Sequence, residues 1–198
     1  MRDQRCAFCG QKAHFRCRAT DELLCLDHAA IEVIAAAPAE PGAVAVASAV
    51  KEDSAGIVAL AHHFWDEVEV YCFDRIYDLS ELPAFVVSIE SVLVGALSYS
   101  IEPRQLVIVL LAVLPGFQGR GIATNLIDAA TGEAVARGLP RVAVATSNDD
   151  LPALYLYQRN GFTISEVRPG EILQHHAGEL SGFAGIPIRD EIRLVRTV

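Results

Sequence analysis

The sequence predicts an α/β domain with a small metal-binding module ahead of it, and three observations lead to this class. Residues 105–114 form a β-branched run that is apolar on both faces, as a strand buried inside a sheet would be. A glycine pair follows and opens an amphipathic segment that runs to about residue 137, and a second apolar strand covers residues 141–146. Two pairs of metal-ligand residues lie near the N-terminus. At 198 residues, the chain has room for one full domain and a small module.

Turn and capping residues bound each element of this strand, helix, strand unit. Pro115 and Gly116 end the first strand, and Gly138 and Pro140 close the helix. Between them, apolar residues recur at helical spacing and predict a buried face. This stripe consists of Ile122, Leu126, Ile127, Ala130, Ala134 and Val135.

Shorter elements are expected upstream of this unit. We expect a strand over residues 44–50 and then a helix capped by Asp53 or Ser54. Strands over residues 84–90 and 91–101 should form a hairpin that leads into the central strand. The core stripe of the upstream helix should consist of Ile57, Leu60, Ala61, Phe64 and Trp65, and the neighbouring His62 and His63 are interpreted as structural.

The segment from Gln118 to Ala123 predicts a site for a phosphate group. Gly119 and Gly121 allow the backbone to approach a ligand closely, and the first turn of the following helix has N–H groups without intrahelical partners. The helix dipole favours an anion at this end, and Arg120 adds a formal positive charge.

A second informative block covers residues 146–162. It predicts a short helix that Asn148 or Asp149 caps through a side-chain oxygen and that Gly161 ends in the left-handed conformation. Tyr157 lies four residues before this glycine. Tyr155 is the competing position, since residues two apart on a helix point about 200° away from each other.

These blocks resemble the acetyl-CoA-binding core of the GNAT N-acetyltransferase family. In that family, Gln/Arg-x-x-Gly-x-Gly/Ala holds the cofactor pyrophosphate, and Gln118, Gly121 and Ala123 occupy its three defining positions. Residues 146–162 resemble the next motif of the family, although its usual helix-start Asn is replaced here by Asp150. Residues 185–194 resemble the closing strand of one subgroup, so the resemblance covers about residues 44–198.

The resemblance implies a central mixed, mostly antiparallel sheet of about six to seven strands with helices on both faces. It also implies direct transfer of an acetyl group from acetyl-CoA to a primary amine, with Tyr157 as the general acid. Glu102 is the expected base, with Glu90, His175 and His176 as alternatives. The implied cofactor contacts are main-chain groups of Leu111 and Val113, the residues Gln118, Gly119, Arg120, Gly121 and Ala123, and Asn148 and Asp150 at the helix start.

The N-terminal residues predict a zinc site. Cys6 and Cys9 form one pair, and Cys25 and His28 form a second pair fifteen residues further on, as a tetrahedral zinc ion requires. A disulfide framework is the alternative. The order of these residues resembles a B-box with an incomplete second site, which leaves Cys17 and His14 open as further ligands.

The domain boundaries follow from these assignments. Residues 1–34 form the zinc-finger module, residues 35–43 form a linker rich in alanine and proline, and residues 44–198 form the acetyltransferase domain. The module could bind a protein partner, and the chain could be a homodimer. A chain that binds acetyl-CoA as a sensor, with little or no turnover, is the alternative function.

Composition narrows the partners and the location. The net charge of −9 argues against nucleic acid, and no apolar run is long enough to span a membrane, so we expect a cytoplasmic protein. The acceptor could be a small molecule or a protein. We expect the acidic and aromatic segment 69–78 to contact it and to favour a cationic amine.

Overall fold

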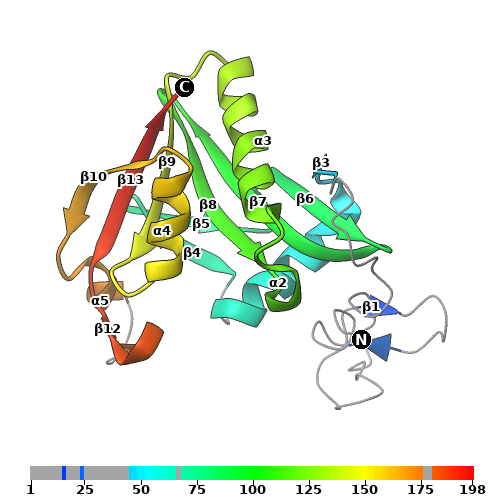
Figure 1. Ribbon diagram of the computed structural model, residues 1–198, viewed down its shortest axis with the longest axis horizontal. Coiled ribbons are helices and arrows are strands. Elements are labelled where there is room, and N and C mark those ends of the chain that lie inside the picture. The colour runs from blue at the N-terminus through cyan, green and yellow to red at the C-terminus, as the bar shows by residue number, and fades with distance from the viewer. Residues whose placement is uncertain (1–14, 17–22, 25–44, 66–67, 176–179) are drawn as a thin grey trace.

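A computed structural model describes residues 15–16, 23–24, 45–65, 68–175 and 180–198 (Figure 1). Its main feature is a seven-stranded sheet with the strand order β10-β13-β9-β8-β7-β6-β3. The strands are β3 (Ala47–Ser48), β6 (Ala84–Ile89), β7 (Val92–Glu102), β8 (Gln105–Val113), β9 (Arg141–Ser147), β10 (Thr163–Arg168) and β13 (Glu191–Thr197).

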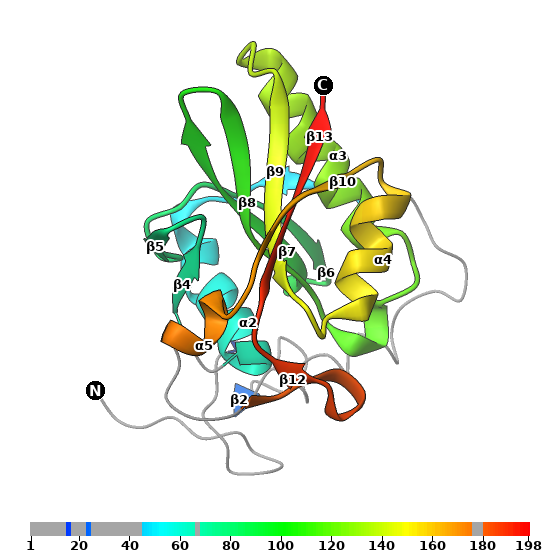
Figure 2. The same ribbon diagram turned by 90° about the vertical axis from the view of Figure 1, so that its left-hand side faces the viewer.

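The pairing of these strands confirms the expected sheet. β8 and β9 pair in parallel, whereas every other neighbouring pair in the sheet is antiparallel. The helices α3 (Ile122–Ala136) and α4 (Leu151–Arg159) cover one face, and α2 (Ser54–Trp65) lies on the other (Figure 2). The sheet is therefore mixed and mostly antiparallel, with helices on both faces.

The core lies between the sheet and these helices. The apolar run of β8 contributes Leu106 and Ile108, both almost fully buried, and α3 buries its stripe against the sheet. Val135 is the exception to the predicted stripe, since it is 59% exposed near the end of α3. Gly138 adopts the left-handed conformation that terminates this helix, as the sequence predicted.

The upstream elements are shorter than expected. The predicted strand over residues 44–50 is reduced to β3, and a 3₁₀ turn, η1 (Lys51–Asp53), precedes α2. The Asp53 carboxylate accepts a hydrogen bond from the Val50 N–H at 2.9 Å, so it caps this turn. Ile57, Leu60 and Ala61 are buried as predicted, and the expected β6–β7 hairpin is confirmed.

A β-bulge separates β8 from β9 at their carboxyl-terminal ends. Ser98 pairs with Leu110 and Tyr99 pairs with Ile108, so Val109 has no partner on β7. Pairing between β8 and β9 covers only the three rungs from Leu106 to Ile108, although both strands continue further. The two strands therefore diverge beyond the bulge, and this opening positions the candidate site.

Among the described residues, three two-stranded sheets lie outside the main sheet, and two of them follow α2 in the chain. The hairpin of β4 (Glu69–Cys72) and β5 (Arg75–Asp78) lies with α5 (Glu171–His175) on the side of the sheet that carries α2 (Figure 2). β11 (Leu180–Ser181) pairs with β12 (Pro187–Ile188) in the connection between α5 and β13.

The predicted zinc ligands Cys6, Cys9, Cys25 and His28 lie outside the described residues. Between the two predicted ligand pairs, β1 (Phe15–Arg16) and β2 (Leu23–Leu24) form an antiparallel hairpin. The described part of the chain contains no group of three or more His, Cys, Asp or Glu side chains that could hold a metal ion. In that same part, no helix is both long and apolar enough to cross a membrane.

Candidate functional site

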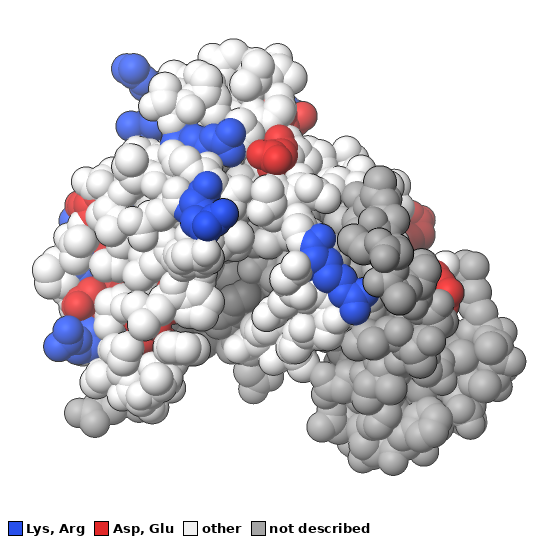
Figure 3. Space-filling model, in the orientation of Figure 1, with Lys and Arg blue, Asp and Glu red and all other residues white. Residues whose placement is uncertain are grey.

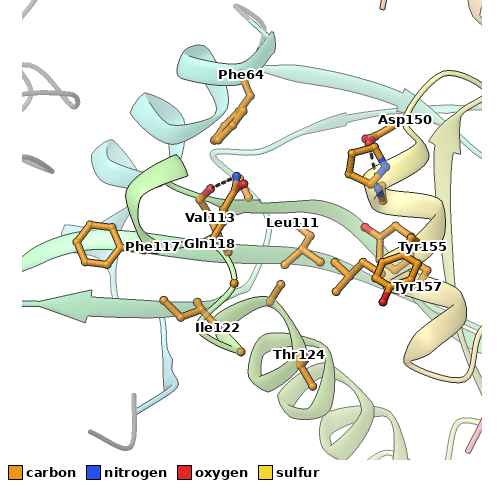
Figure 4. Close-up of a pocket in the computed structure, with 17 residues that line it drawn as sticks. Phe64, Leu111, Val113, Phe117, Gln118, Ile122, Thr124, Asp150, Tyr155 and Tyr157 are labelled. Carbon is orange, nitrogen blue, oxygen red and sulfur yellow. Dashed lines mark hydrogen bonds between the residues drawn. The ribbon is translucent and has the colours of Figure 1, made fainter. Parts of the chain in front are cut away.

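A cavity of about 520 Å³ lies where β8 and β9 diverge, between α3 and α4 (Figure 4). Figure 4 shows Leu111 and Val113 from β8, Ile122 and Thr124 from α3, and Tyr157 from α4 around this common space. The cavity unites eight of the residues singled out from the sequence: Leu111, Val113, Gln118, Gly119, Gly121, Ala123, Asp150 and Tyr157.

The edge of β8 presents main-chain groups to the cavity. The N–H of Leu114 donates to the carbonyl of Val94 on β7 at 2.9 Å. Because the main-chain groups of successive strand residues point to alternate sides, those of Leu111 and Val113 point away from β7 and toward the opening. The amide of Gln118 donates to the Val113 carbonyl at 2.9 Å, which ties the end of β8 to the glycine segment.

The glycine segment has the backbone conformation that an anion cradle needs. Gly119 and Gly121 have φ angles of 75° and 79°, in the left-handed region that favours glycine. A Cβ atom on either residue would meet no other atom within 4 Å, so the space beside them is open to a ligand.

The start of α3 supplies donors to the same space. The first main-chain bond of the helix runs from the Asn125 N–H to the Gly121 carbonyl at 3.0 Å. The N–H groups of Ile122, Ala123 and Thr124 therefore have no acceptor within the helix, and all three residues line the cavity. This is a site for a negatively charged group at the positive end of a helix dipole.

Arg120 lies beside the cradle rather than in the cavity wall. Its guanidinium carbon lies 5.2 Å from the centroid of the Phe117 ring, and Arg120 is not among the lining residues. On the face that carries α3 and α4, basic side chains lie on both sides of the central hollow (Figure 3). Their charges favour an anionic ligand there.

Tyr157 is the buried tyrosine of the cavity. Only 6% of it is exposed, and its ring packs against Phe162 with 5.6 Å between the centroids. Burial raises the pKa of the phenol well above its usual value, and the negative charge of Asp150 raises it further. The phenol has no hydrogen-bond partner among the described residues, so a neutral O–H group is available to donate a proton.

Tyr155, the competing position, has a different environment. It is 64% exposed, and its hydroxyl accepts a hydrogen bond from Arg159 at 3.2 Å. It borders the cavity on the outer turn of α4. The half-turn offset predicted from the sequence therefore separates one buried phenol from one solvent-facing phenol.

Asp150, and neither Asn148 nor Asp149, caps α4. Its carboxylate accepts a hydrogen bond from the Ala153 N–H at 3.0 Å, so the predicted cap was wrong by one or two residues. The side chain of Asn148 instead accepts hydrogen bonds from the N–H groups of Arg189 and Asp190, at 2.8 and 2.9 Å. Asn148 is not among the residues that line the cavity.

Glu102, the expected base, lies at the opposite end of β8 from the cavity. It pairs with Gln105 at the tip of the β7–β8 hairpin and accepts hydrogen bonds from Tyr77 at 2.9 Å and from Gln105 at 2.8 Å. It is absent from the cavity lining. The structure does not bring this carboxylate together with the Tyr157 phenol.

The alternative bases lie outside the cavity as well. Glu90 lies in the turn between β6 and β7, at a φ angle of 47°. His175 stacks on Tyr71 with 3.5 Å between the ring centroids, and His176 lies outside the described residues. Of the described residues that line the cavity, Asp150 is the one carboxylate, and it is engaged as the cap of α4.

One of the three carboxylates expected to select a cationic amine, Asp74, is already paired with arginines. Asp74 accepts hydrogen bonds from Arg193 at 2.9 Å and from Arg168 at 3.1 Å. Arg193 also bonds to Glu191 and Glu166, and the Tyr71 hydroxyl donates to Glu171 at 2.8 Å. These contacts fasten the β4–β5 hairpin to the sheet, so the charge of Asp74 is already neutralised by arginines and is not free to select an amine.

Phe64 is a cavity residue that the sequence did not reveal. It was assigned to the core stripe of α2, but it is 37% exposed and borders the cavity. An apolar residue at a helix end has the same spacing whether it faces the core or a ligand, so no signal in the sequence separates the two cases.

Comparisons with known proteins agree with this geometry. A model of the Acetyltransferase (GNAT) family matches residues 44–162, more than half of the chain. The uncharacterized protein YxbD of Bacillus subtilis (strain 168) is 26% identical over 145 residues, which cover 71% of this chain and 90% of that protein.

Solved structures share the fold. A Bacillus subtilis acetyltransferase in complex with CoA is similar at 22% identity and a TM-score of 0.64, covering 78% of this chain and 99% of its own. An IAA acetyltransferase from Bacillus cereus ATCC 14579 is similar at 22% identity and a TM-score of 0.62, covering 79% of this chain and 100% of its own.

Proposed function

Because this chain belongs to the GNAT family and is therefore an acetyltransferase, we propose that it moves an acetyl group from acetyl-CoA to a primary amine of a small molecule or a protein. One observation carries the proposal. A single cavity unites the open edge of β8, the bare start of α3 and the buried phenol of Tyr157.

The residues of the cavity fit the acyl donor. The N–H groups from Gly119 to Thr124 would hold the diphosphate, because they lack acceptors within the described chain and lie at the positive end of α3. The main-chain groups of Leu111 and Val113 would bond to the amide-containing arm. When bound, acetyl-CoA supplies a thioester whose acetyl group the amine takes up.

Tyr157 would hold the proton that the leaving sulfur needs. Its neutral phenol donates from the oxygen atom, and the raised pKa keeps that proton in place at physiological pH. Glu102 is left out of this step, because it is bonded to Tyr77 at the far end of β8. We assign Glu102 to holding the β4–β5 hairpin.

The test is turnover by the full chain. Thiol release from acetyl-CoA would be followed with spermidine, tobramycin, L-lysine and an alanine-initiated peptide as acceptors. Tyr157→Phe should slow the fastest of these reactions by about 100- to 1000-fold, because the leaving thiolate loses its proton donor.

Tyr99→Phe is the matched control for this variant. Tyr99 is also 6% exposed, and its phenol has no hydrogen-bond partner in the described part of the chain, but it lies outside the cavity. The rate of the Tyr99→Phe variant should therefore match that of the wild type. Binding of acetyl-CoA without acetylation of any of the four amines would identify a sensor and contradict the proposal.

We further propose that residues 1–34 bind one zinc ion through Cys6, Cys9, Cys25 and His28, and that residues 35–43 link this module to the domain. The β1–β2 hairpin supports this, because it reverses the chain between the two ligand pairs. The family match beginning at residue 44 supports the boundary. Zinc-bound thiolates suit the reducing cytoplasm.

Metal analysis tests the zinc proposal. The purified full chain should contain about one zinc ion per molecule, as four ligands predict. Exchange of Cys6 and Cys9 for serine should abolish this content, whereas the matched Cys72→Ser change should preserve it, since Cys72 is a free, buried cysteine of the domain. Zinc-free chain that retains the same stability would contradict the proposal.

A further inference from the structure

Asp149 joins two segments that are far apart in the sequence. Only 5% of this residue is exposed. One carboxylate oxygen accepts a hydrogen bond from the Ser147 hydroxyl, and the other accepts a hydrogen bond from the N–H of Phe183 at 2.9 Å. The residue at the end of β9 thereby holds the connection between β11 and β13.

Gly182 fits the same junction. A Cβ atom at this position would overlap the Asp149 carboxylate, so a side chain cannot be added without displacing one of the two. Gly182 has an ordinary negative φ, which means that contact with Asp149, rather than backbone conformation, requires glycine here.

Asn148 adds further bonds to the same segment. Its side chain accepts from the N–H groups of Arg189 and Asp190 and donates to the Pro187 carbonyl at 3.0 Å. We call Asn148 and Asp149 together the β9 clamp and residues 181–190 the clamped loop. All the polar atoms of the two clamp side chains are used within the protein, so neither residue is left free to bind acetyl-CoA.

The clamped loop lies at the open end of the divergence between β8 and β9. Both ribbon views place β12 at the carboxyl-terminal end of β9, close to the start of α4 (Figures 1 and 2). Asp150, the residue after the clamp, caps α4 and lines the cavity. The loop is therefore hydrogen-bonded to a residue that is the chain neighbour of the cavity wall.

The clamped loop presents an apolar side chain at this end. Phe183 is 52% exposed although its main chain is held by Asp149, and Ala184 follows it with a φ of 53°. Phe64 of α2 borders the cavity itself. An exposed aromatic residue on a loop fixed by buried hydrogen bonds is typical of a contact surface.

We propose that Asp149 is a positioning residue for the acceptor amine, and that it acts by holding Phe183 and the clamped loop at the acceptor end of the cavity. This rests on the proposed acetyl transfer. The donor would occupy the bare start of α3, so the amine has to enter through the remaining open end, where the clamped loop lies.

The test measures, in the same variants, the KM for the acceptor amine and the Kd for acetyl-CoA. In Asp149→Ala, the KM for the fastest of the four amines should rise about tenfold, because the loop loses a buried hydrogen bond to a charged group. The Kd for acetyl-CoA, measured by calorimetry, should stay within about twofold of the wild-type value, since its proposed ligands are unchanged. Asp149→Asn should restore the KM, because an amide can still accept from Phe183 and bond to Ser147.

Further variants separate positioning from a general loss of stability. Gly182→Ala should raise the same KM, and its effect should shrink in the Asp149→Ala background, where most of the overlapping atoms are gone. Asp53→Ala is the matched control, since it removes a carboxylate that holds a main-chain N–H outside the cavity.

An unchanged amine KM in Asp149→Ala would overturn the proposal, as would an equal weakening of amine and acetyl-CoA binding. Failure of the proposed function would look different, because the wild-type chain would then acetylate none of the four amines. In that case, rapid hydrogen exchange at Phe183 in Asp149→Ala alone would still show that the clamp holds the loop.

Discussion

The two sides of the sheet differ in whether their polar groups are already bonded to other groups of the protein. On the side of α3 and α4, the cavity contains main-chain donors at the start of α3 and the neutral phenol of Tyr157, and none of them has a hydrogen-bond partner among the described residues. On the side of the β4–β5 hairpin, Arg193 and Arg168 are each bonded to several carboxylates, and those carboxylates are shared in turn. The second region carries far more charge, yet the first region has the vacant bonding capacity.

This difference shows that charge density is a poor guide to a binding site. A cluster of ionised groups that satisfies itself has little to offer a ligand, and its bonds instead fix the hairpin on the sheet. Main-chain groups that have no protein partner and lie next to open space remain available to water or to a ligand. The bare start of α3 is therefore the more informative feature, although it contains hardly any charged side chains.

The largest effect expected from this comparison is a loss of stability without a loss of donor binding. Arg193→Ala would leave Glu191, which is 3% exposed, as a buried carboxylate without its partner. The free energy of unfolding, from urea titration, should fall by about 3 kcal/mol. The folded fraction should still bind coenzyme A with the wild-type Kd.

Arg137→Ala is the control for that variant. Its guanidinium forms an exposed pair with Glu133 at 2.6 Å, and loss of such a pair should lower the free energy of unfolding far less than Arg193→Ala does. Equal losses in the two variants would show that the network under the hairpin contributes no more than a surface pair.

The next-largest effect should be weaker binding of coenzyme A in a variant whose stability falls no further than that of a matched control. Gly121→Ala forces a Cβ atom onto a residue with a φ of 79° and disturbs the cradle, so the Kd for coenzyme A should rise about 10- to 100-fold by calorimetry. Gly138→Ala has a comparable φ of 67° and equally open surroundings, but it lies at the far end of α3. The Gly138→Ala variant should lose a similar free energy of unfolding and keep the wild-type Kd. Equal Kd values in the two variants would show that the glycine segment does not bind coenzyme A.

The pKa shifts of carboxylates in the two regions have opposite directions: they are downward beside the β4–β5 hairpin and upward at Asp150 in the cavity wall. Hydrogen bonds from Arg193 and Tyr71 hold the pKa values of Asp74 and Glu171, respectively, below their usual range. Their stabilising contribution is present above the unfolded pKa values, near 4, and is lost as the pH falls through the folded values. Glu171→Gln should therefore flatten the decline of stability below about pH 4.5. A decline as steep as in the wild type would show that this carboxylate is not linked to folding.

The smallest effect is expected at Asp150. Burial raises the pKa of this carboxylate, so its charge is unfavourable in the folded state at neutral pH. Asn caps a helix as well as Asp does, and Asp150→Asn should change the midpoint of thermal unfolding at pH 7 only slightly and upward. A marked decrease would mean that the charge itself stabilises α4.

Sequence patterns predicted the elements whose signals are local. The apolar run of β8, the stripe of α3 and the left-handed Gly161 each depend on residues close together in the chain, and the structure has all three. The choice of Tyr157 over Tyr155 rested on its spacing to Gly161 within the same short motif, and Tyr157 is the buried residue of the two.

Contacts between distant residues could not be predicted in the same way. Asn148 bonds to Arg189 and Asp190, more than forty residues away, and Glu102 bonds to Tyr77 on a separate hairpin. The bulge at Val109 is a property of backbone pairing, which its side chain does not encode. A position in the family motif suggested a cavity role for Asn148, and a position just ahead of the central strand suggested one for Glu102, but the contacts of these residues do not support either role.

The most direct measurement is amide NMR of the full chain during titration with coenzyme A. We expect the largest shifts at the N–H groups of Gly119, Gly121, Ile122 and Ala123, while the N–H signals of the β4–β5 hairpin barely move. Silent cradle amides together with large shifts in residues 69–78 would contradict it, because the ligand would then bind on the charged side of the sheet.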